Sequence, residues 1–400
     1  MAIKIGVVGA PNKGKSTFFK AVTLKDVDIA NYPFTTIKPN VGVGFVTTKC
    51  PCAEFKVKCA PQNSRCIDGI RLVPVELVDI AGLVPLAHEG KGMGNQFLSD
   101  ISLADVMIHV IDCSGKTDVN GEGTDGADVT QEVEFLENEI GMWLYGIISS
   151  KWDKYTRLIL QLKSVPLVFF VENLSTYGIT ETDIVAALDS MGKGPEDIMA
   201  LSPDELKEFV FELIRLSKCS IILANKIDMP TSAANLEMIR AKYTDKVIIP
   251  ASCEAELALR NAASSGLIDY VPGGADFKVK DGVALTDKQK KGLEFLRDNV
   301  LKKYGSTGVV TALNKAVFDV LGYIVVYPVE NETHFSNKNG QAFPDAILIR
   351  KGSNALDLAY KIHTDIGDHF IRAINARTKQ VVGKDYVLKA DDIIKIVAGK

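Results

Sequence analysis

A stretch near the start of the chain has the residue types and spacing that bind phosphate groups. Residues 9–16 (GAPNKGKS) fit the pattern G-x-x-x-x-G-K-S/T, with an apolar β-rich run before them and a helical pattern after them. Glycines let backbone N–H groups turn towards phosphate oxygens, and the start of the helix adds a positive dipole. We expect Lys15 to reach the β- and γ-phosphates of a nucleotide and Ser16 to bind Mg²⁺. The residues that we expect around the phosphates are Gly9, Asn12, Lys13, Gly14, Lys15, Ser16 and Thr17.

An apolar run that ends in an acid supplies a second phosphate motif. Asp79 closes the run VELVD, and Gly82 completes the pattern D-x-x-G. Beside bound phosphates, such an Asp holds the Mg²⁺ shell and such a Gly N–H contacts the γ-phosphate. The motif is weak on its own, but it follows the phosphate loop at a suitable distance. We therefore expect Asp79 to bind the metal and Gly82 to contact the γ-phosphate.

A third motif selects the base of the nucleotide. The apolar run 219–224 ends in NKID, and the carboxylate of Asp228 can accept hydrogen bonds from N1–H and the exocyclic amine of guanine. Adenine offers neither donor, so this residue discriminates between the bases. Lys226 can cover the ring with its aliphatic stem, and SCE after the next strand matches a loop whose N–H contacts guanine O6. The alternative is that NKID merely ends a core strand. The residues that we expect at the base are Asn225, Lys226, Asp228, Ser252, Cys253 and Glu254.

Taken together, these motifs resemble a known family. The segments GAPNKGKST, YPFTTIKPN, DIAGLVPLAHEGKGMGNQFL, NKID and SCEAE are similar to those of the Obg-related translation-factor GTPases, specifically the YchF-like branch and its archaeal-type members. The resemblance covers nearly the whole chain. It implies a P-loop NTPase G domain that binds GTP, GDP and Mg²⁺. It also implies a C-terminal TGS domain, the small β-grasp module also found in threonyl-tRNA synthetases and SpoT-type enzymes.

The segment between the first two motifs should contain a further metal ligand. Thr35 and Thr36 are both candidates to close on Mg²⁺ and the γ-phosphate when GTP is bound. The resemblance to relatives that have one Thr before I-x-P-N favours Thr36. We therefore expect Lys15, Thr36 and Gly82 to act in catalysis, and Ser16, Thr36 and Asp79 to hold Mg²⁺.

Two positions bear on the choice of nucleotide and on the attacking water. YchF proper has lost the base-selecting Asp and can prefer ATP, whereas this chain retains Asp228, so we expect GTP. Leu83 stands where Ras-like enzymes have a water-orienting Gln. The YchF-like relatives also place an apolar residue at this position. The water would then be oriented by K⁺ bound at Asn12, by His88, or by a partner, whose cation can be worth roughly 10³–10⁵ in rate. Asn12 could instead simply tolerate a left-handed backbone, and His88 could be an exposed loop residue.

The elements that must position these residues predict an α/β domain. Apolar runs near 41–47, 72–79, 106–112, 219–224 and 247–251 alternate with helical patterns, which indicates a mostly parallel sheet with the nucleotide at the carboxyl ends of its strands. The chain between Asp79 and Asn225 is far longer than one crossover needs, so it contains a helical insertion at about 115–218. Its segment VEFLENEIGMWLYGIISSKWDKYTRLILQL predicts a helical pair or coiled-coil-like arm followed by shorter helices. An enlarged core is the alternative.

We divide the chain into a G domain (1–285), a helical connector (286–321) and a TGS domain (322–400). The helical insertion and the TGS domain are the expected contacts to ribosome or RNA. Basic residues on the TGS surface would make such contacts, or would form a solvated basic face. They are Lys351, Lys361, Arg372, Arg377 and Lys379.

Four cysteines between two expected strands have the spacing C-x-C-x₆-C-x₆-C. Cys50, Cys52, Cys59 and Cys66 can make a tetrahedral Zn²⁺ site that staples a loop. The usual paired C-x₂-C knuckles are absent, however, and free or partly exposed thiols are the alternative. The other cysteines, Cys113, Cys219 and Cys253, lie beside strands and are expected to be small core residues.

Composition excludes few function classes. The net charge of −4 gives no polyanion footprint over the whole chain, and the net charge of +2 on residues 322–400 is too small to predict RNA binding. No apolar run has the length of a membrane span, the start lacks a signal-peptide layout, and seven cysteines argue against a disulfide framework. We expect a cytosolic protein that is not a membrane protein, and a monomer is favoured.

Two function classes follow from these observations. In the first, the protein is a GTP-hydrolysing switch, slow without an activator, that binds ribosome or RNA. Nucleotide state would order residues 31–40 and 82–95, and the helical insertion and TGS domain would respond. In the second, suggested by Leu83 and the cysteine loop, the protein is a nucleotide-gated scaffold with little or no hydrolysis. A metabolic phosphotransferase would need an acceptor-activating base, for which we find no motif.

Overall fold

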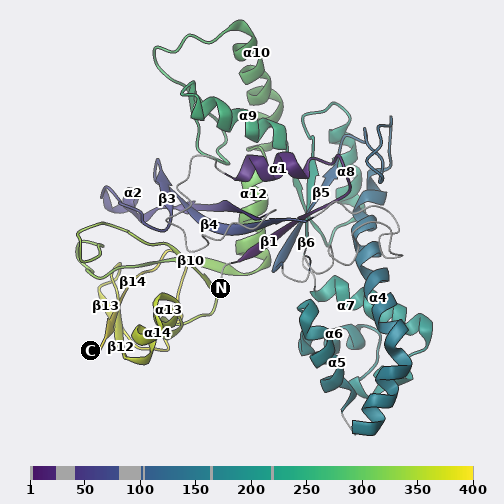
Figure 1. The fold of residues 1–400 in the computed structure, drawn as a ribbon. Helices are drawn as coiled ribbons and strands as arrows, with labels where there is room; N and C mark the ends of the chain where they lie inside the picture. Colours follow the sequence, from purple (N-terminus) through teal and green to yellow (C-terminus); the bar gives the residue numbers. More distant parts are fainter. Residues whose placement is uncertain are drawn as a thin grey trace.

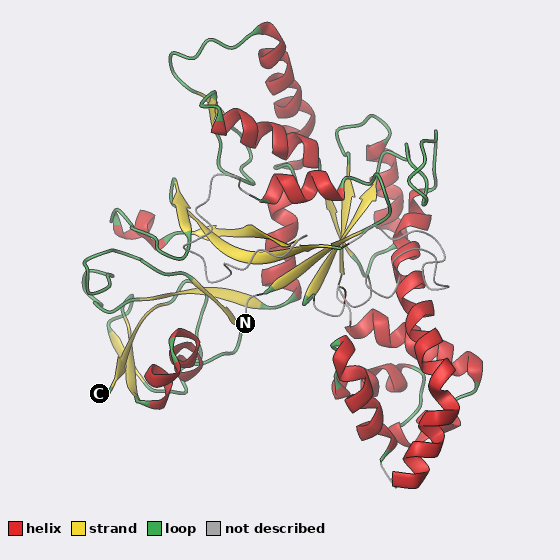
Figure 2. Cartoon of the chain, in the orientation of Figure 1, coloured by secondary structure: helices red, strands yellow, loops and turns green. Residues whose placement is uncertain are grey.

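A sheet of seven strands forms the centre of the molecule (Figures 1 and 2). The computed structural model describes residues 3–23, 41–80, 101, 104–162, 165–217 and 220–399. The strands are β1 (Lys4–Val8), β2 (Val41–Lys49), β3 (Arg65–Ile67), β4 (Ile70–Asp79), β5 (Val106–Asp112), β6 (Ser220–Asn225) and β7 (Val247–Pro250). Their order is β2-β4-β1-β5-β6-β7, with β3 paired to β4 outside this path. Only the pairings of β2 and β3 with β4 are antiparallel, so the prediction of a mostly parallel sheet is confirmed.

The register of the parallel strands brings the predicted motifs to one edge. Val7 pairs with Asp79, and Asp112 pairs with Asn225. All seven residues of β5 are buried, as expected for a strand with helices on both faces. Because the carboxyl ends of parallel strands meet at one edge, the ends of β1, β4, β5 and β6 lie together at the edge where ligands bind in such folds.

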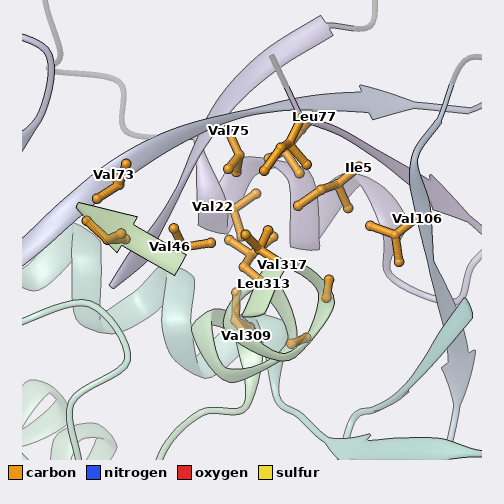
Figure 3. Close-up of a cluster of buried hydrophobic side chains, with 14 of the residues drawn as sticks. Ile5, Val22, Val46, Val73, Val75, Leu77, Val106, Val309, Leu313 and Val317 are labelled. Atoms are coloured by element: carbon orange, nitrogen blue, oxygen red, sulfur yellow. The ribbon is translucent and has the colours of Figure 1, made fainter. Parts of the chain in front are cut away.

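The hydrophobic core on one face of the sheet joins segments that are far apart in sequence. Helix α1 (Lys15–Val22) follows β1, and helix α12 (Val309–Asn314) packs beside it. Figure 3 shows Ile5 and Leu77 of the sheet grouped with Leu313 of α12. A π-helical turn, Lys315–Val320, extends α12 and leads directly into the C-terminal domain. The predicted connector therefore does two things. It packs against the G-domain sheet through α12, and it links that sheet to the C-terminal domain.

A helical lobe extends from the sheet on the side of β5 (Figure 1). Its longest element is α4 (Val129–Leu162), a helix of 34 residues, which packs against α7 (Pro203–Ser217). The buried apolar side chains of α4 recur every three or four residues for most of its length, as one face of a helix requires. They are Val129, Val133, Leu136, Ile140, Leu144, Ile148, Tyr155 and Ile159.

The lobe has its own aromatic core. Trp143 packs edge-on against Tyr177 at 5.3 Å between ring centroids, and Trp152 lies 5.8 Å from Phe170. The shorter helices α5 (Pro166–Leu174) and α6 (Glu181–Ser190) complete it. Within the described residues, no helix combines the length and the apolar character that crossing a bilayer demands.

The remaining elements before the C-terminal domain follow β6 in the chain. Ser252 caps helix α9 by accepting a hydrogen bond from the N–H of Ala255 at 3.2 Å. The carboxylate of Glu256, buried on α9, accepts hydrogen bonds from Arg260 and Tyr270. These contacts fix α9 against the hairpin that follows it. The elements are α8 (Ser232–Lys242), α9 (Cys253–Ser264), β8 (Ile268–Asp269), β9 (Lys278–Val279), α10 (Asp287–Leu296) and α11 (Lys302–Tyr304).

The C-terminal domain is a five-stranded sheet of order β11-β10-β14-β12-β13. Its strands are β10 (Tyr323–Pro328), β11 (Ile347–Arg350), β12 (Phe370–Asn375), β13 (Gln380–Val382) and β14 (Ile393–Ala398), and its helices are α13 (Ala355–Ile362) and α14 (Thr364–Asp368). The apolar side chains of α13 pack on the sheet, with Leu358 and Ala355 fully buried. The domain lies beside the β2–β3 segment, which contains the short helix α2 (Pro51–Phe55) (Figure 1).

Candidate functional site

The loop between β1 and α1 has the backbone geometry of a phosphate cradle. Gly9 and Gly14 have φ angles of 144° and 100°, in the region that favours glycine. A Cβ atom at Gly14 would lie 2.2 Å from Asn225 Nδ2, and one at Gly9 would lie 2.4 Å from the carbonyl oxygen of Val110. Gly14 precedes α1, whose N-terminus has no side-chain cap. The first N–H groups of α1 are therefore suited to binding an anion.

Lys15 and Asp79 come together below this loop. The Lys15 ammonium donates to the carbonyl oxygen of Ala10 at 2.7 Å. Burial lowers the pKa of Lys15 and raises the pKa of Asp79, and each charge opposes the shift of the other. Ser16 lies exposed in the first turn of α1. A hydroxyl and a carboxylate are oxygen ligands of the kind that Mg²⁺ prefers, so these residues fit the expected ion.

Asn225 joins the phosphate loop to the predicted base-binding segments. Its Nδ2 donates to the carbonyl oxygen of Lys13 at 2.8 Å, and its Oδ1 accepts from the N–H of Cys253 at 3.0 Å. Asn225 is buried, so both contacts lie away from solvent. Asp228 is half-buried and close enough to add to the raised pKa of the Cys253 thiol, which burial and Glu256 mainly cause. One amide thus holds the two nucleotide-binding regions in register.

Lys226 is oriented by an acid that sequence reasoning did not identify. Its φ angle is 62°, and its ammonium donates to Asp112 Oδ2 at 2.7 Å. Asp112 is fully buried at the end of β5, where it also accepts hydrogen bonds from Ser114 Oγ and Thr117 Oγ1. Burial favours a higher pKa for Asp112, but these hydrogen bonds and the Lys226 charge hold its pKa below the usual value. The Asp112 carboxylate therefore holds the side chain of Lys226 at the carboxyl edge of the sheet.

A loop after β5 is fastened to the phosphate loop by Lys13. The side chain of Lys13 is fully buried, and its ammonium donates to Glu132 Oε1 at 2.6 Å and to Thr117 Oγ1 at 2.9 Å. Asn12, with a φ angle of 59°, donates through Nδ2 to the carbonyl oxygen of Gly121 at 2.9 Å. The side chain of Lys13 therefore braces the phosphate loop from within the protein.

Glu132 is the acid on which this contact depends. Its Oε2 accepts the N–H of Asp112 at 2.9 Å, so both carboxylate oxygens are engaged. Burial raises the pKa of Glu132 to about 7, against the opposing effect of the Lys13 ammonium. Glu132 lies in the first turn of α4, and the pair therefore joins the phosphate loop to the helical lobe.

His109 on β5 lies beneath the phosphate loop. A Cβ on Gly9 would lie 3.6 Å from His109 Cδ2. Burial lowers the pKa of His109 to about 3, and the positive charges of Lys15, Lys246 and Lys13 lower it further. The imidazole is therefore neutral at physiological pH.

The structure brings most of the predicted residues to the carboxyl edge of the sheet. Thr17 is half-buried on α1, and Glu254 is exposed at the start of α9. Five of the positions predicted for the nucleotide site lie outside the described residues. They are Thr35, Thr36, Gly82, Leu83 and His88.

The cysteines divide into the two groups that the sequence suggested. Cys113 and Cys253 are buried beside β5 and β7, whereas Cys219 lies outside the described residues. The four cysteines of the β2–β3 segment come together, with their Sγ atoms all within 4.8 Å of one another. This cluster lies beside the C-terminal domain, because Arg71 donates to both Cys50 Sγ and the carbonyl oxygen of Phe343.

Arg377 and Lys379, which are among the expected basic contacts in the C-terminal domain, have partners within the chain. Arg377 forms an ion pair with Glu54 of α2. The ammonium of Lys379 donates to the carbonyl oxygen of Glu332 at 2.5 Å and lies over the ring of Phe335. Lys351, Lys361 and Arg372 are exposed. A basic face directed at solvent would therefore depend on residues such as Lys351 and Arg372 more than on Arg377.

Asp112, Glu132 and His109 are the residues of the site that sequence reasoning missed. One signal was available for Asp112, because it ends a buried apolar run as Asp79 does. Glu132 and His109 offered no comparable signal. Their contacts depend on residues that lie about a hundred positions away, such as the pair of Glu132 with Lys13.

Comparison with known protein families agrees with this geometry. Residues 4–144 match the 50S ribosome-binding GTPase model, residues 223–331 match the G4 motif-containing domain of Obg-like GTPases of the YGR210-like type, and residues 334–398 match the TGS domain. The three matched segments contain, in turn, the phosphate loop, the NKID region and most of the C-terminal sheet. The expected G domain and TGS domain are therefore both present.

Individual relatives resemble the chain over its whole length. An uncharacterised GTP-binding protein of Methanocaldococcus jannaschii is 48% identical, with 98% of each chain covered. The ribosome-binding ATPase YchF of Mycoplasma genitalium is 32% identical, with 98% of each chain covered. The crystal structure of a GTP-binding protein from Pyrococcus horikoshii is 38% identical, has a TM-score of 0.76, and covers 99% of this chain and 100% of its own.

Proposed function

Because the chain belongs to the YchF-like branch of the Obg-related GTP-binding proteins, we propose that it hydrolyses GTP to GDP and phosphate and acts as a nucleotide-controlled switch on the ribosome. The observation that carries this proposal is the position of Asn225. It links the phosphate loop to the NKID and SCE segments by two buried hydrogen bonds. A change at the phosphates can thus reach the base-binding segments through one rigid amide.

The proposed roles follow the positions of the side chains. Lys15 is positioned to neutralise the β- and γ-phosphates once its ammonium leaves the Ala10 carbonyl. Ser16 and Asp79, together with Thr36, would hold Mg²⁺, and the ion would neutralise charge on the phosphate oxygens. The N–H of Gly82 would contact the γ-phosphate. These assignments make charge stabilisation the main source of catalysis.

Guanine specificity is assigned to Asp228. YchF relatives carry the name ribosome-binding ATPase, so nucleotide choice within the family needs a residue-level argument. The half-buried Asp228 can accept the two donors that guanine presents and adenine lacks. We assign GTP to this chain on that ground.

The attacking water needs an orienting group other than residue 83. Leu83 has no polar atom that could orient water. We propose that K⁺ beside Asn12 assists, since the Asn12 side chain uses its Nδ2 on Gly121 and retains a carbonyl oxygen for a cation. The ribosome would supply a further group. The rate of phosphate release, measured in potassium and in sodium buffers with and without ribosomes, separates these two contributions.

Two parts of the molecule support a ribosomal partner. The TGS domain exposes Lys351 and Arg372, which suit a phosphate backbone. The helical lobe exposes the large apolar side chains of Leu160 and Val165, which lie 73% and 62% open to solvent where α4 ends and α5 begins. Exposed apolar side chains grouped at one site are typical of a contact surface.

Co-sedimentation with ribosomes tests the switch. The protein should pellet with ribosomes in the presence of a non-hydrolysable GTP analogue and remain in the supernatant with GDP. Equal binding in both states would exclude a nucleotide-dependent ribosomal switch. The second candidate, a nucleotide-gated scaffold, is favoured by Leu83. It requires analogue-dependent binding with phosphate release near zero in every cation and with ribosomes present.

A further inference from the structure

The cysteines of the β2–β3 segment are arranged like the ligands of a metal ion. Cys50 precedes α2, Cys52 lies in α2, Cys59 lies in the following loop, and Cys66 lies in β3. Their four Sγ atoms are all within 4.8 Å of one another, so four separate parts of the segment converge. Cys50 is buried and the others are half-buried, which leaves the cluster largely shielded from water.

The spacing of the sulfur atoms fits tetrahedral coordination. A Zn–S distance of about 2.3 Å places the sulfurs of a regular tetrahedron roughly 3.8 Å apart. The Sγ atoms of Cys52 and Cys66 lie 3.7 Å apart. A disulfide requires about 2.05 Å, and these cysteines are unbonded. One small ion at the centre would therefore satisfy all four sulfurs with little movement.

A buried arginine supplies the charge that such a centre needs. Arg71 is fully buried, and its Nη2 donates to Cys50 Sγ at 3.3 Å. Within the described part of the chain, no carboxylate lies within 4.0 Å of its guanidinium. Burial raises the pKa of the nearby Asp345, against the opposing charge of Arg71, and the two groups form no direct ion pair. A buried cation without a directly paired anion is costly. Four thiolates around one divalent ion carry a net charge of about −2, which would more than balance the single positive charge of Arg71.

The same arginine connects the cluster to the C-terminal domain. Arg71 Nη2 also donates to the carbonyl oxygen of Phe343 at 2.9 Å, and its guanidinium lies 5.5 Å from the ring centre of Tyr327. The hydroxyl of Tyr327 donates to the carbonyl oxygen of Lys49, next to Cys50, at 3.2 Å. Contacts of the cysteine cluster therefore reach across the interface between the two domains.

The loop between Cys59 and Cys66 forms backbone contacts at this interface. The N–H groups of Ala60 and Gln62 donate to the carbonyl oxygens of Ala342 and Pro344 at 2.9 and 2.7 Å. Asn63 exchanges two hydrogen bonds with the backbone of Ala346, at 3.0 and 3.1 Å. Such a loop has no regular structure of its own, so it needs another constraint to keep this shape.

We propose that Cys50, Cys52, Cys59 and Cys66 bind one structural Zn²⁺ ion, which holds the 50–66 segment in the shape on which the C-terminal domain docks. The ion would act as a staple between α2, the 56–64 loop and β3. It is independent of the nucleotide site, so the proposal can fail while the GTPase assignment stands.

Metal analysis of the full-length protein is the first test. Protein purified under reducing conditions without added chelator should contain about one Zn²⁺ per chain. Exchange with Co²⁺ should produce the visible absorption bands of tetrahedral thiolate coordination. A metal-free protein, or one that contains iron in place of zinc, would overturn the proposal.

Substitutions assign the metal to these residues. Cys52→Ser and Cys66→Ser should each reduce the zinc content from about one per chain to near zero. Cys113→Ser is the matched control, because Cys113 is a buried cysteine outside the cluster whose thiol donates to the carbonyl oxygen of Ser232. It should retain full zinc content. Full zinc content in Cys66→Ser would contradict the assignment.

Hydrogen exchange tests the link to domain docking. After zinc is removed by a chelator, the amides of Ala60, Gln62 and Ala346 should exchange faster, because their hydrogen bonds cross the interface. Amides of β5 should keep their protection and show that the G domain remains folded. Unchanged protection at the interface in metal-free protein would show that the ion has no role in docking.

Discussion

The ammonium of Lys13 lies 2.6 Å from the carboxylate of Glu132, and the exposed fractions of the two side chains are 0% and 3%. This pair joins the phosphate loop to the first turn of the long helix α4. The other carboxylate oxygen of Glu132 accepts a hydrogen bond from the N–H of Asp112 at 2.9 Å. The phosphate loop is therefore held from beneath by an ion pair that does not face the nucleotide.

Removal of one partner of this pair should destabilise the protein strongly. Glu132→Ala leaves the Lys13 ammonium buried with only neutral acceptors, and the expected loss in unfolding free energy is about 3–5 kcal/mol. The double variant Lys13→Met with Glu132→Leu should cost less than the sum of the single variants, because no charge remains buried. Urea unfolding followed by circular dichroism measures both values.

An exposed ion pair provides the control for this measurement. Lys116 pairs with Asp125, whose side chain is 88% exposed. Asp125→Ala should change the unfolding free energy by less than about 1 kcal/mol. A small effect of Glu132→Ala, equal to that of Asp125→Ala, would show that the buried pair contributes little.

The local motifs of the site could be predicted from sequence because each lies within a few residues of a strand end. The phosphate loop, Asp79 and NKID all follow apolar runs, and the parallel sheet brings such ends together. The pair of Lys13 and Glu132 could not be found in this way. Its two residues are 119 positions apart, and each looks like a solvated charge within its own segment.

Arg71 shows the same limit in the cysteine region. It stands near the start of an alternating strand, where a charged side chain normally faces water. The structure buries it because the C-terminal domain covers that end of β4, with Phe343 accepting a hydrogen bond. Contacts between domains depend on the tertiary arrangement, so they cannot be predicted from the periodicity of the sequence.

Asn225 should be essential to both stability and nucleotide binding. Asn225→Ala leaves the carbonyl oxygen of Lys13 and the N–H of Cys253 without their partner, and each buried unsatisfied group costs about 1–3 kcal/mol. The phosphate loop and the base-binding segments would also no longer be held in a fixed position relative to each other. GTP affinity should fall at least about tenfold, which equals roughly 1.4 kcal/mol. Calorimetric titration with GTP and urea unfolding measure the two effects.

A neighbouring amide provides the comparison. Asn235 donates through Nδ2 to the carbonyl oxygen of Cys113 at 2.9 Å and does not contact the phosphate loop in the described structure. Asn235→Ala should lower the unfolding free energy without a matching loss of GTP affinity. Similar GTP affinity in both variants would refute the bridging role of Asn225.

Asp228 should determine the preference for GTP over ATP. Asp228→Asn replaces one acceptor oxygen with a donor, so the two guanine donors can no longer both be accepted. The ratio of GTP to ATP affinities should fall by one to two orders of magnitude, since an unpaired buried donor costs about 1–3 kcal/mol. Competition binding with both nucleotides measures this ratio. Asp245 is an exposed acid, and the control substitution Asp245→Asn should leave the ratio unchanged. An unaltered ratio in Asp228→Asn would remove this residue from base selection.

His109 should make the protein less stable in mild acid. Burial, with added repulsion from Lys15, Lys246 and Lys13, lowers its pKa to about 3 in the folded protein, from 6.5 in the unfolded chain. Between these values the unfolded chain binds a proton that the folded protein does not, so stability falls as the pH drops below 6.5. At about pH 5 the loss should be about 2 kcal/mol.

The substitution His109→Leu isolates this contribution, because it removes the titrating group whatever its own effect on packing. The unfolding free energy of the variant should decline less steeply between about pH 6.5 and pH 4 than that of the parent protein. The exposed His334 provides the control, and His334→Gln should keep the parent slope. If His109→Leu followed the parent slope instead, the imidazole would have to be protonated inside the folded protein. The phosphate loop would then lie above a charged histidine.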